Sequence, residues 1–460
     1  MFKDENNNID LISGDPKKAI IKLATPMVFS MFVVMLYKLT DSIWVAGLGG
    51  DALAAIGFIM PLYVILTGVG DSIAAGANSL ISRKIGSKNH KQANNGALHS
   101  LLLCIIISAI FTIVMLVFMV PIFKMLGVGH SMQYALDYGY VMFGLLFFIE
   151  LELLLMSLFK AEGNMKTLTL VLILSYVVNM ILDPLLIYVL NWGISGAAWA
   201  TVLSSALGAF ILGFFMWSKR GVYLDMSIKN FNFQFPLIND ILKVAVPSTF
   251  ESMLYSVGII IINNMIVSVS KSVAVGYYST AMNIVQFANL PLSAIGVAVL
   301  TISGVAYGAN NAKNLKTTYL YSIKISFVIA IVFLILLYAF APQISSLFAY
   351  NDSSLAPNIA NALAIDCFFL ITYPMGTMTT MLFKGAGKGL YSFIFAVIRC
   401  FILAILFAYL FGFVFGWGFN GILAGEVFGN LVGVLLGYVW ARLFIRNFDK
   451  NIEKSNVETS

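Results

Sequence analysis

Charged residues are scarce in this chain of 460 residues, where they make up 10% of the sequence. Soluble domains carry about 25%. Hydrophobic residues account for 60%, and the mean hydropathy is +0.92. This composition excludes a soluble globular protein and leaves a membrane protein as the class that fits.

Cysteine and histidine are also rare, with three of each. The cysteines lie inside apolar stretches, at Cys104, Cys367 and Cys400, and the histidines share no common spacing. No disulfide framework, metal centre or cofactor is therefore expected. An intramembrane enzyme, which would need a clustered nucleophile or metal ligands, is excluded on the same grounds.

The N-terminal segment lacks the basic, apolar and small-residue order of a removable signal peptide, so the first apolar segment is expected to direct insertion. The net charge of +6 comes from basic residues spread singly between apolar segments, a distribution that argues against a nucleic-acid partner. With both termini in the cytoplasm, 23 of the 27 Lys and Arg residues fall on the cytoplasmic side. We expect a multi-pass protein of the plasma membrane with both ends inside the cell.

Twelve apolar runs are long enough to cross a bilayer, which takes roughly 20 residues per helix. They lie at 18–48, 52–82, 94–122, 132–158, 164–191, 193–217, 238–270, 273–303, 317–346, 357–384, 389–415 and 418–445. Most exceed the length that a bilayer needs, which predicts tilted or kinked helices. The expected fold is an all-α polytopic membrane protein.

The two halves of the chain resemble each other in four short segments. The pairs are 24–26 with 245–247, 85–86 with 307–308, 159–163 with 383–387, and WGISGAAWAT at 192–201 with WGFNGILAGE at 417–426. All four pairs are separated by 221 to 225 positions, so the chain is predicted to be a tandem repeat of six helices.

An even number of helices per repeat predicts two six-helix bundles related by a pseudo-two-fold axis along the membrane normal. The expected domains are an N-terminal lobe over 1–217, a C-terminal lobe with a polar tail over 239–460, and a cytoplasmic linker over 218–238. This linker is the longest polar-leaning connection and is expected to carry the hinge between the lobes.

Ionisable residues inside apolar segments are candidate functional residues, because charges are costly in hydrocarbon. They are Lys38, Asp41, Asp71, Glu150, Glu152, Asp183, Glu251, Asp366, Arg399 and Glu426. Three polar residues of the first half, Asp41, Asp183 and Thr201, share a depth of about 10 to 12 Å below the outer surface at about 1.5 Å per helical residue. A common depth is what a shared site requires.

Neighbouring residues add further oxygen atoms at this depth, which supports a shared site. Asn179 lies one turn before Asp183, Tyr37 lies one turn before Asp41, and a proline after Asp183 leaves a backbone carbonyl free. Two carboxylates, an amide and a hydroxyl suit a hard monovalent cation or a shared proton. The alternative is structural: Asp41 would neutralise Lys38, and Asp183 would cap the backbone beside the proline.

The second half does not repeat the acidic pair. The corresponding positions are Ile262 or Asn263 and Phe407, whereas Glu426 replaces the threonine, so the function is expected to be asymmetric. Glu251 follows a proline and is either a further proton or substrate site or an interhelical hydrogen-bonding residue. The candidates for lining a substrate cavity are Tyr37, Lys38 and Glu251.

Several motifs resemble the multidrug and toxic compound extrusion (MATE) family over nearly the whole chain. They are the pattern from Pro26 to Asp41, ISRKIGSKN at 81–89, NMILDPLLIY at 179–188 with GISGAAWAT at 193–201, and KGAGK at 384–388. The nearest branch is the one named after a DNA-damage-inducible member. Lys38 departs from the family pattern, and Tyr373 stands where a sodium-dependent branch has an aspartate.

The resemblance implies an antiporter that exports small cationic or amphipathic organic compounds by alternating access. It implies exchange for H⁺ or Na⁺, bound in the first lobe at Asp41, Asn179, Asp183 and Thr201. A monomer in the lipid bilayer is expected. The alternative is a lipid-linked oligosaccharide flippase of the same superfamily, which would need more cavity cations than Lys38 and Arg399. A channel would not explain an acidic layer in one half only.

Overall fold

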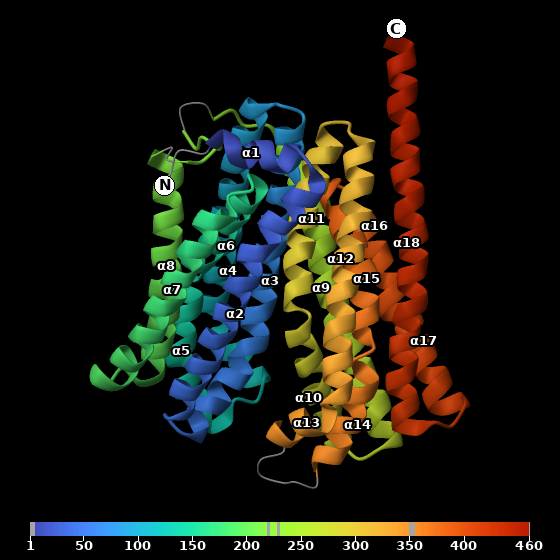
Figure 1. Ribbon diagram of the computed structural model, residues 1–460. Helices are drawn as coiled ribbons and strands as arrows, with labels where there is room; N and C mark the ends of the chain where they lie inside the picture. The colour runs from blue at the N-terminus through green and yellow to red at the C-terminus, as the bar shows by residue number, and fades with distance from the viewer. Residues whose placement is uncertain (1–4, 219–220, 228–230, 349–354, 460) are drawn as a thin grey trace. The chain divides into compact units, whose positions relative to one another are not determined.

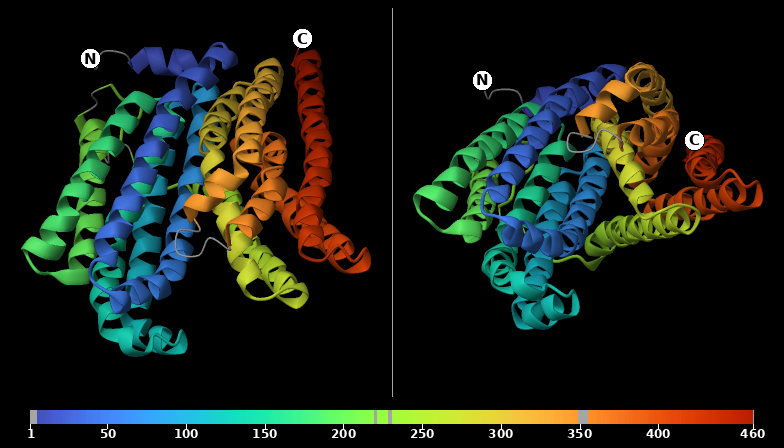
Figure 2. Two further views of the ribbon diagram at one scale, coloured as in Figure 1. Left: turned by 60° about the horizontal axis from the view of Figure 1, so that its bottom comes forward. Right: turned by 90° about the horizontal axis from the view of Figure 1, so that it is seen from below.

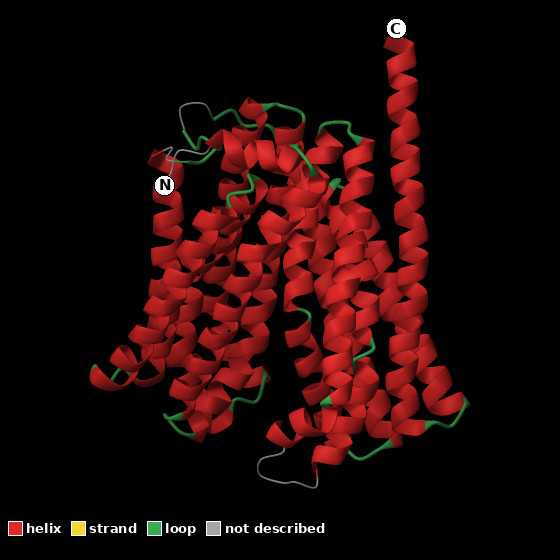
Figure 3. Ribbon diagram, in the orientation of Figure 1, coloured by secondary structure: helices red, strands yellow, loops and turns green. Residues whose placement is uncertain are grey.

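The structure is a computed structural model that describes residues 5–218, 221–227, 231–348 and 355–459. Helices make up nearly all of this described part, which contains no strand (Figures 1 and 3). Apolar segments of this length form helices because lipid offers no hydrogen bonds, so each backbone group must be bonded within its own segment. The chain divides into two compact units, Met1–Gly14 with Thr25–Val246, and Asp15–Ala24 with Pro247–Ser460.

The helices of the first half share short, tight connections. They are α1 (Glu5–Ser13), α2 (Pro16–Ala46), α3 (Gly50–Gly86), α4 (His90–Met125), η1 (Gly129–Ser131), α5 (Met132–Gly144), α6 (Leu146–Ala161), α7 (Met165–Pro184), η2 (Leu185–Val189) and α8 (Gly193–Ser218). Within each unit the long helices run side by side (Figure 2).

The second half of the chain is also built of helices. They are α9 (Phe235–Val269), α10 (Val273–Ala288), α11 (Leu290–Gly308), α12 (Ala312–Ala339), α13 (Ala341–Phe348), α14 (Ala356–Asp366), α15 (Phe369–Gly385), α16 (Gly389–Ala396), η5 (Val397–Leu403), α17 (Ala404–Tyr409), η6 (Leu410–Val414) and α18 (Gly418–Thr459). At 42 residues α18 is about twice the length that a bilayer needs, and it extends past the other helices of its unit (Figure 1).

Twelve membrane spans are accounted for in the described chain. Ten helical stretches are long and apolar enough to cross a membrane alone, and two bent pairs supply the other two. These pairs are η1–α5 with α6, bent by 47°, and α14 with α15, bent by 44°. The polytopic helical fold predicted from the sequence is confirmed, and these two spans are kinked.

The internal repeat is visible in the backbone between the second and third spans of each half. Lys88 and Asn310 occupy the left-handed region with φ of 56° and 51°. Each is followed by an asparagine, Asn89 or Asn311, that caps the next helix by accepting the N–H three residues on, at 3.1 and 2.9 Å. The 222-residue offset found in the sequence therefore corresponds to the same local geometry in both halves.

The described part of the predicted linker is hydrogen-bonded to helices of the first unit. Glu162 accepts the backbone N–H of Tyr223 at 3.0 Å, and His99 Nε2 accepts that of Gln234 at 2.9 Å. The linker residues 219–220 and 228–230 lie outside the described residues. The compact units change over at Val246, inside α9, rather than in this segment.

Glycines line one side of α18 at every fourth position. They are Gly421, Gly425, Gly429, Gly433 and Gly437. Each faces the eleventh span, which consists of α16, η5, α17 and η6. A Cβ at Gly429 would lie 2.6 Å from the carbonyl carbon of Leu403. Small residues at this spacing allow two helix backbones to approach closely.

Candidate functional site

The interior of the first unit holds two polar side chains on α7 that have no hydrogen-bond partner in the described chain. Asp183 and Asn179 are both 0% exposed, and within the described chain none of their four side-chain polar atoms has a hydrogen bond. An unsatisfied buried polar group costs about 1–3 kcal/mol. Such groups indicate a bound proton, ion or water that satisfies them in the working protein.

The backbone beside Asp183 is also irregular. Pro184 ends the α-helical part of α7, and the chain continues as the π-helical turn η2. Proline cannot donate a backbone hydrogen bond, and π-helical turns occur frequently at functional sites. The local sequence therefore produces the irregular helix that presents this carboxylate inside the unit.

Helices α2 and α8 bring further polar groups to the same place. The carboxyl groups of Asp41 and Asp183 are near enough to interact electrostatically. The Tyr37 hydroxyl lies within hydrogen-bonding reach of Thr201, and the Tyr37 ring stacks on Tyr176 with centroids 5.1 Å apart. The structure thus brings the candidate residues of α2, α7 and α8 together.

Lys38 is not part of this group. Its side chain is exposed, and in the described chain it forms no ion pair with Asp41. The alternative reading, in which the lysine neutralises Asp41, is therefore not the arrangement found. Nor does Asp183 cap the backbone, because its carboxylate oxygens have no hydrogen-bond partner among the residues that the structure describes.

Two tyrosines of this site were missed from the sequence. Tyr138 on α5 is 4% exposed and lies close enough to interact with both Asp41 and Asp183. Tyr63 on α3 interacts with Asp41 as well. A single tyrosine in an apolar segment gives no signal of its own, so only the packing of α3 and α5 reveals these neighbours.

The two glutamates of α6 point to different neighbours, as expected for residues two positions apart. Glu150 is 1% exposed, packs against Gly70 and interacts electrostatically with Asp71. Glu152 lies on the side of α6 that faces α8, where Gly208 leaves room for its carboxylate. The acidic character of the first unit therefore extends beyond the predicted pair.

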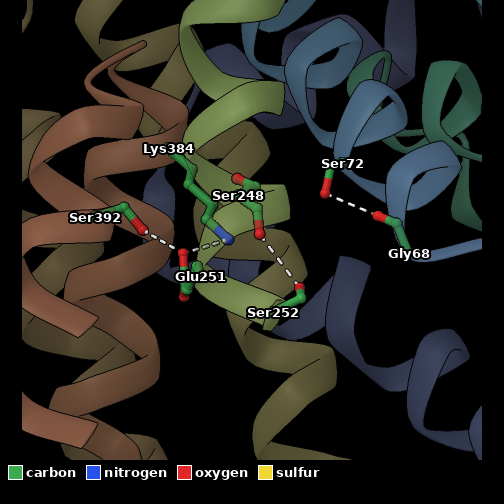
Figure 4. Close-up of polar contacts among 7 residues, drawn as sticks. All are labelled: Gly68, Ser72, Ser248, Glu251, Ser252, Lys384 and Ser392. Carbon is green, nitrogen blue, oxygen red and sulfur yellow. Dashed lines mark hydrogen bonds and ion pairs between the residues drawn. The ribbon is translucent and has the colours of Figure 1, made fainter. Parts of the chain in front are cut away.

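Glu251 in the second unit forms an interhelical ion pair. Its Oε2 lies 3.0 Å from Lys384 Nζ on α15 and accepts a hydrogen bond of 3.0 Å from Ser392 on α16 (Figure 4). The side chains of the glutamate and the lysine are 20% and 12% exposed. Of the two roles considered from the sequence, this arrangement provides the interhelical contact.

This pair is expected to stabilise the second unit. Glu251→Gln or Lys384→Met should each lower the free energy of unfolding by about 1–3 kcal/mol, a range between those of exposed and fully buried pairs. The double variant should lose less than the sum, because it leaves no uncompensated charge. Thermal unfolding in detergent measures the cycle. The exposed pair of Asp240 and Lys243 is the control, with a coupling of about 0–1 kcal/mol.

The remaining charged candidates also lie in the second unit. Tyr278 donates its hydroxyl hydrogen to Glu426, with distances of 3.1 and 3.3 Å to the two carboxylate oxygens. Asp366 is 0% exposed, its oxygens have no hydrogen-bond partner in the described chain, and it interacts electrostatically with Glu426. Arg399 lies on η5, near Tyr373.

In the described residues, no three His, Cys, Asp or Glu side chains come together as a metal centre. The donor set of the first unit is instead two carboxylates, one amide and hydroxyls. Hard oxygen donors of this kind are able to hold a proton or one monovalent cation. The orphaned oxygens of Asp183 and Asn179 fit such an occupant.

Two units of membrane-spanning helices, with polar side chains converging inside each, define a polytopic transporter rather than an enzyme. Residues 26–185 and 247–410 match the MatE family, and the chain belongs to this family of multidrug efflux transporters. The two matched segments lie one in each half and confirm the repeat inferred from the sequence.

Solved structures and curated relatives agree with this assignment. A crystal structure of a MATE protein in complex with MaL6 is 32% identical, covers 96% of this chain and 99% of that chain, and superimposes with a TM-score of 0.92. Multidrug export protein MepA of Staphylococcus haemolyticus is 23% identical over 83% of this chain and 84% of its own length. The FAD transporter of Shewanella oneidensis is 23% identical over 75% and 77%.

Proposed function

We propose that this protein is a secondary antiporter that exports cationic or amphipathic organic compounds in exchange for H⁺ or Na⁺. The coupling site is formed by Asp41, Asn179, Asp183 and Thr201. The observation that carries the proposal is the pair of fully buried side chains on α7 whose four polar atoms have no partner in the described chain. The electrostatic proximity of Asp41 to Asp183 supports it.

Coupling follows from the cost of charge in a low-dielectric interior. Two neighbouring carboxylates repel each other there, and a proton or a sodium ion between them relieves the repulsion. Ion occupancy therefore changes the packing that α2 and α7 prefer. The ion drives export only as far as its affinity differs between the inward-open and outward-open states.

The distribution of Lys and Arg supports a plasma-membrane orientation with both termini in the cytoplasm. A single chain holds the whole coupling site, and we propose that a monomer is the working unit. The cargo enters from the cytoplasmic side and leaves outward while the ion moves in. The two lobes provide the moving parts of this alternating access.

Everted membrane vesicles test the proposal with a pH gradient and a sodium gradient imposed separately. Uptake of a fluorescent organic cation should be accelerated by one of the two gradients and abolished when that gradient is collapsed. Transport that responds to neither gradient contradicts ion coupling. FAD, the cargo in the name of one relative, serves as a second cargo, and its transport in place of the cation would overturn the cationic specificity.

A further inference from the structure

The second unit contains a cavity of about 80 Å³ that the proposed coupling site does not use. Its wall includes both signs of charge, from Arg399 and Glu426, together with Tyr255, Tyr373 and Asn430. Tyr255, a residue of this wall, is 43% exposed. Complete drug sites measure about 300–1,000 Å³, so this cavity is suited to one functional group of a larger cargo.

A charged side chain at the position of Arg399 costs free energy unless a partner or a ligand compensates for it. Arg399 lies ten residues into the eleventh span, about 15 Å along the helix axis and thus near the middle of the hydrocarbon. Charged side chains at this depth mark substrate or ion pathways. Its helix is π-helical over Val397–Leu403, a distortion that is common at functional sites.

The surrounding helices are shaped to hold this arginine. A Cβ at Gly376 would collide with its guanidinium, and one at Gly433 would lie 2.8 Å from its Cβ. Two glycines on α15 and α18 therefore leave space for the side chain. Its guanidinium carbon also lies 5.4 Å from the centroid of the Phe395 ring, a cation–π contact.

The positive charge is nevertheless incompletely satisfied. No ion pair joins Arg399 to Glu426 in the described residues, and the Nε–H of the arginine has no hydrogen-bond acceptor. The carboxylate of Glu426 is held by Tyr278 instead. The cavity thus presents a guanidinium and a carboxyl group that come from separate helices and form no ion pair with each other in the described residues.

The internal repeat relates residues of this cavity to residues of the first unit. At the offsets of 221 to 225, Ile262 or Asn263 corresponds to Asp41, Arg399 to Ser175 and Glu426 to Thr201. The cavity is therefore the counterpart of the acidic site of the first unit. The second unit lacks the acidic pair and has a guanidinium where the first unit has Ser175.

We propose that this cavity binds the anionic end group, a carboxylate or an acid of similar size, of an aromatic amphipathic cargo. Arg399 pairs with the anion, and the tyrosines pack against the adjoining ring. Glu426 lies beside a positive group of the same molecule, so zwitterionic aromatic compounds are the class that fits best. The inference deepens the proposed function, on which it rests, by naming a class of cargo.

Two dyes that differ only at the acid test the proposal. Rhodamine B carries a free carboxylate and a delocalised cation, whereas its ethyl ester keeps only the cation. Hydrogen bonds to charged groups contribute about 1.5–3 kcal/mol, so Arg399→Met should weaken binding of the acid about 10- to 100-fold and leave the ester within about twofold. Fluorescence polarisation of the purified full-length protein measures both dyes.

Arg399→Lys should give an intermediate loss, because it keeps the charge without the planar fork of donors. Arg446→Met, on the exposed C-terminal part of α18, removes the same charge elsewhere and should leave both dyes unaffected. Equal losses for acid and ester, no loss for either, or wild-type protein that binds neither dye would overturn the inference. Melting temperatures identify a variant that fails to fold, and Arg399→Lys then decides.

The binding measurement is independent of ion coupling. If binding of the acid depends on Arg399 but neither gradient drives transport of either dye in vesicles, the proposed function fails and the cavity assignment stands. If gradient-driven transport of the ester is intact but acid and ester bind alike in all variants, the cavity assignment alone is wrong.

Discussion

Gradient-driven efflux is expected to fall at least about fivefold when Asp183 is replaced by asparagine, since coupling free energies between sites are about 1–3 kcal/mol, or about 5–150-fold. The substitution keeps the size of the side chain and removes its ability to ionise. Asp183 is 0% exposed and its oxygens have no hydrogen-bond partner in the described chain, so the amide creates no packing defect. Uptake of an organic cation into everted vesicles, under the gradient that drives the wild type, measures the loss.

Asp41→Asn should give a comparable loss, and the double variant should be little worse than either single one. Two carboxylates that share one proton or ion act as a unit, so their effects are not additive. Asp449→Asn, on the exposed end of α18, is the matched control and should transport like the wild type. Full efflux in both single variants would refute the coupling site while leaving the fold untouched.

The depth of the acidic site was predictable from the sequence, but its full composition was not. Helical rise fixes how far along a span a residue lies, so Asp41 and Asp183 could be placed in one layer. Which side of a helix faces which neighbour depends on tertiary packing. Tyr138 and Tyr63 therefore entered the site only with the structure, as neighbours of these two carboxylates.

The positions of the spans could be predicted from hydropathy, but the breaks and π-helical turns within them could not. Membrane length constrains every apolar run, and the repeat offset supported the count of twelve. The break between α5 and α6 falls at Leu145, where no proline marks it, and η5 lies in an unremarkable apolar run. Such distortions arise where packing, rather than local propensity, determines the backbone.

The glycine stripe of α18 can be recognised in the sequence, but the helix that it contacts cannot. Glycine at every fourth position predicts a close helix contact. The sequence does not say which helix makes it, and the structure identifies the eleventh span. The unusual closeness of this contact also explains why the eleventh span can present Arg399, since Gly433 makes room for the base of that side chain.

Gly429→Ala is therefore expected to destabilise the protein by about 1–3 kcal/mol, the cost typical of overpacking a well-packed interior. The added Cβ would lie 2.6 Å from the carbonyl carbon of Leu403 and 2.7 Å from Cα of Ala404. Both are backbone atoms, which cannot rotate aside, so the two helices must separate. The midpoint of thermal unfolding in detergent should fall accordingly.

Gly276→Ala in α10 is the matched control, because no atom of the described residues outside its own stretch of helix lies within 4 Å of its Cβ position. Alanine is favoured over glycine inside helices by about 0.5–1 kcal/mol, so this variant should be unchanged or slightly more stable. The same substitution thus has opposite signs at two positions of one unit. Equal stability of the two variants would mean that α18 does not approach the eleventh span as closely as the glycine stripe requires.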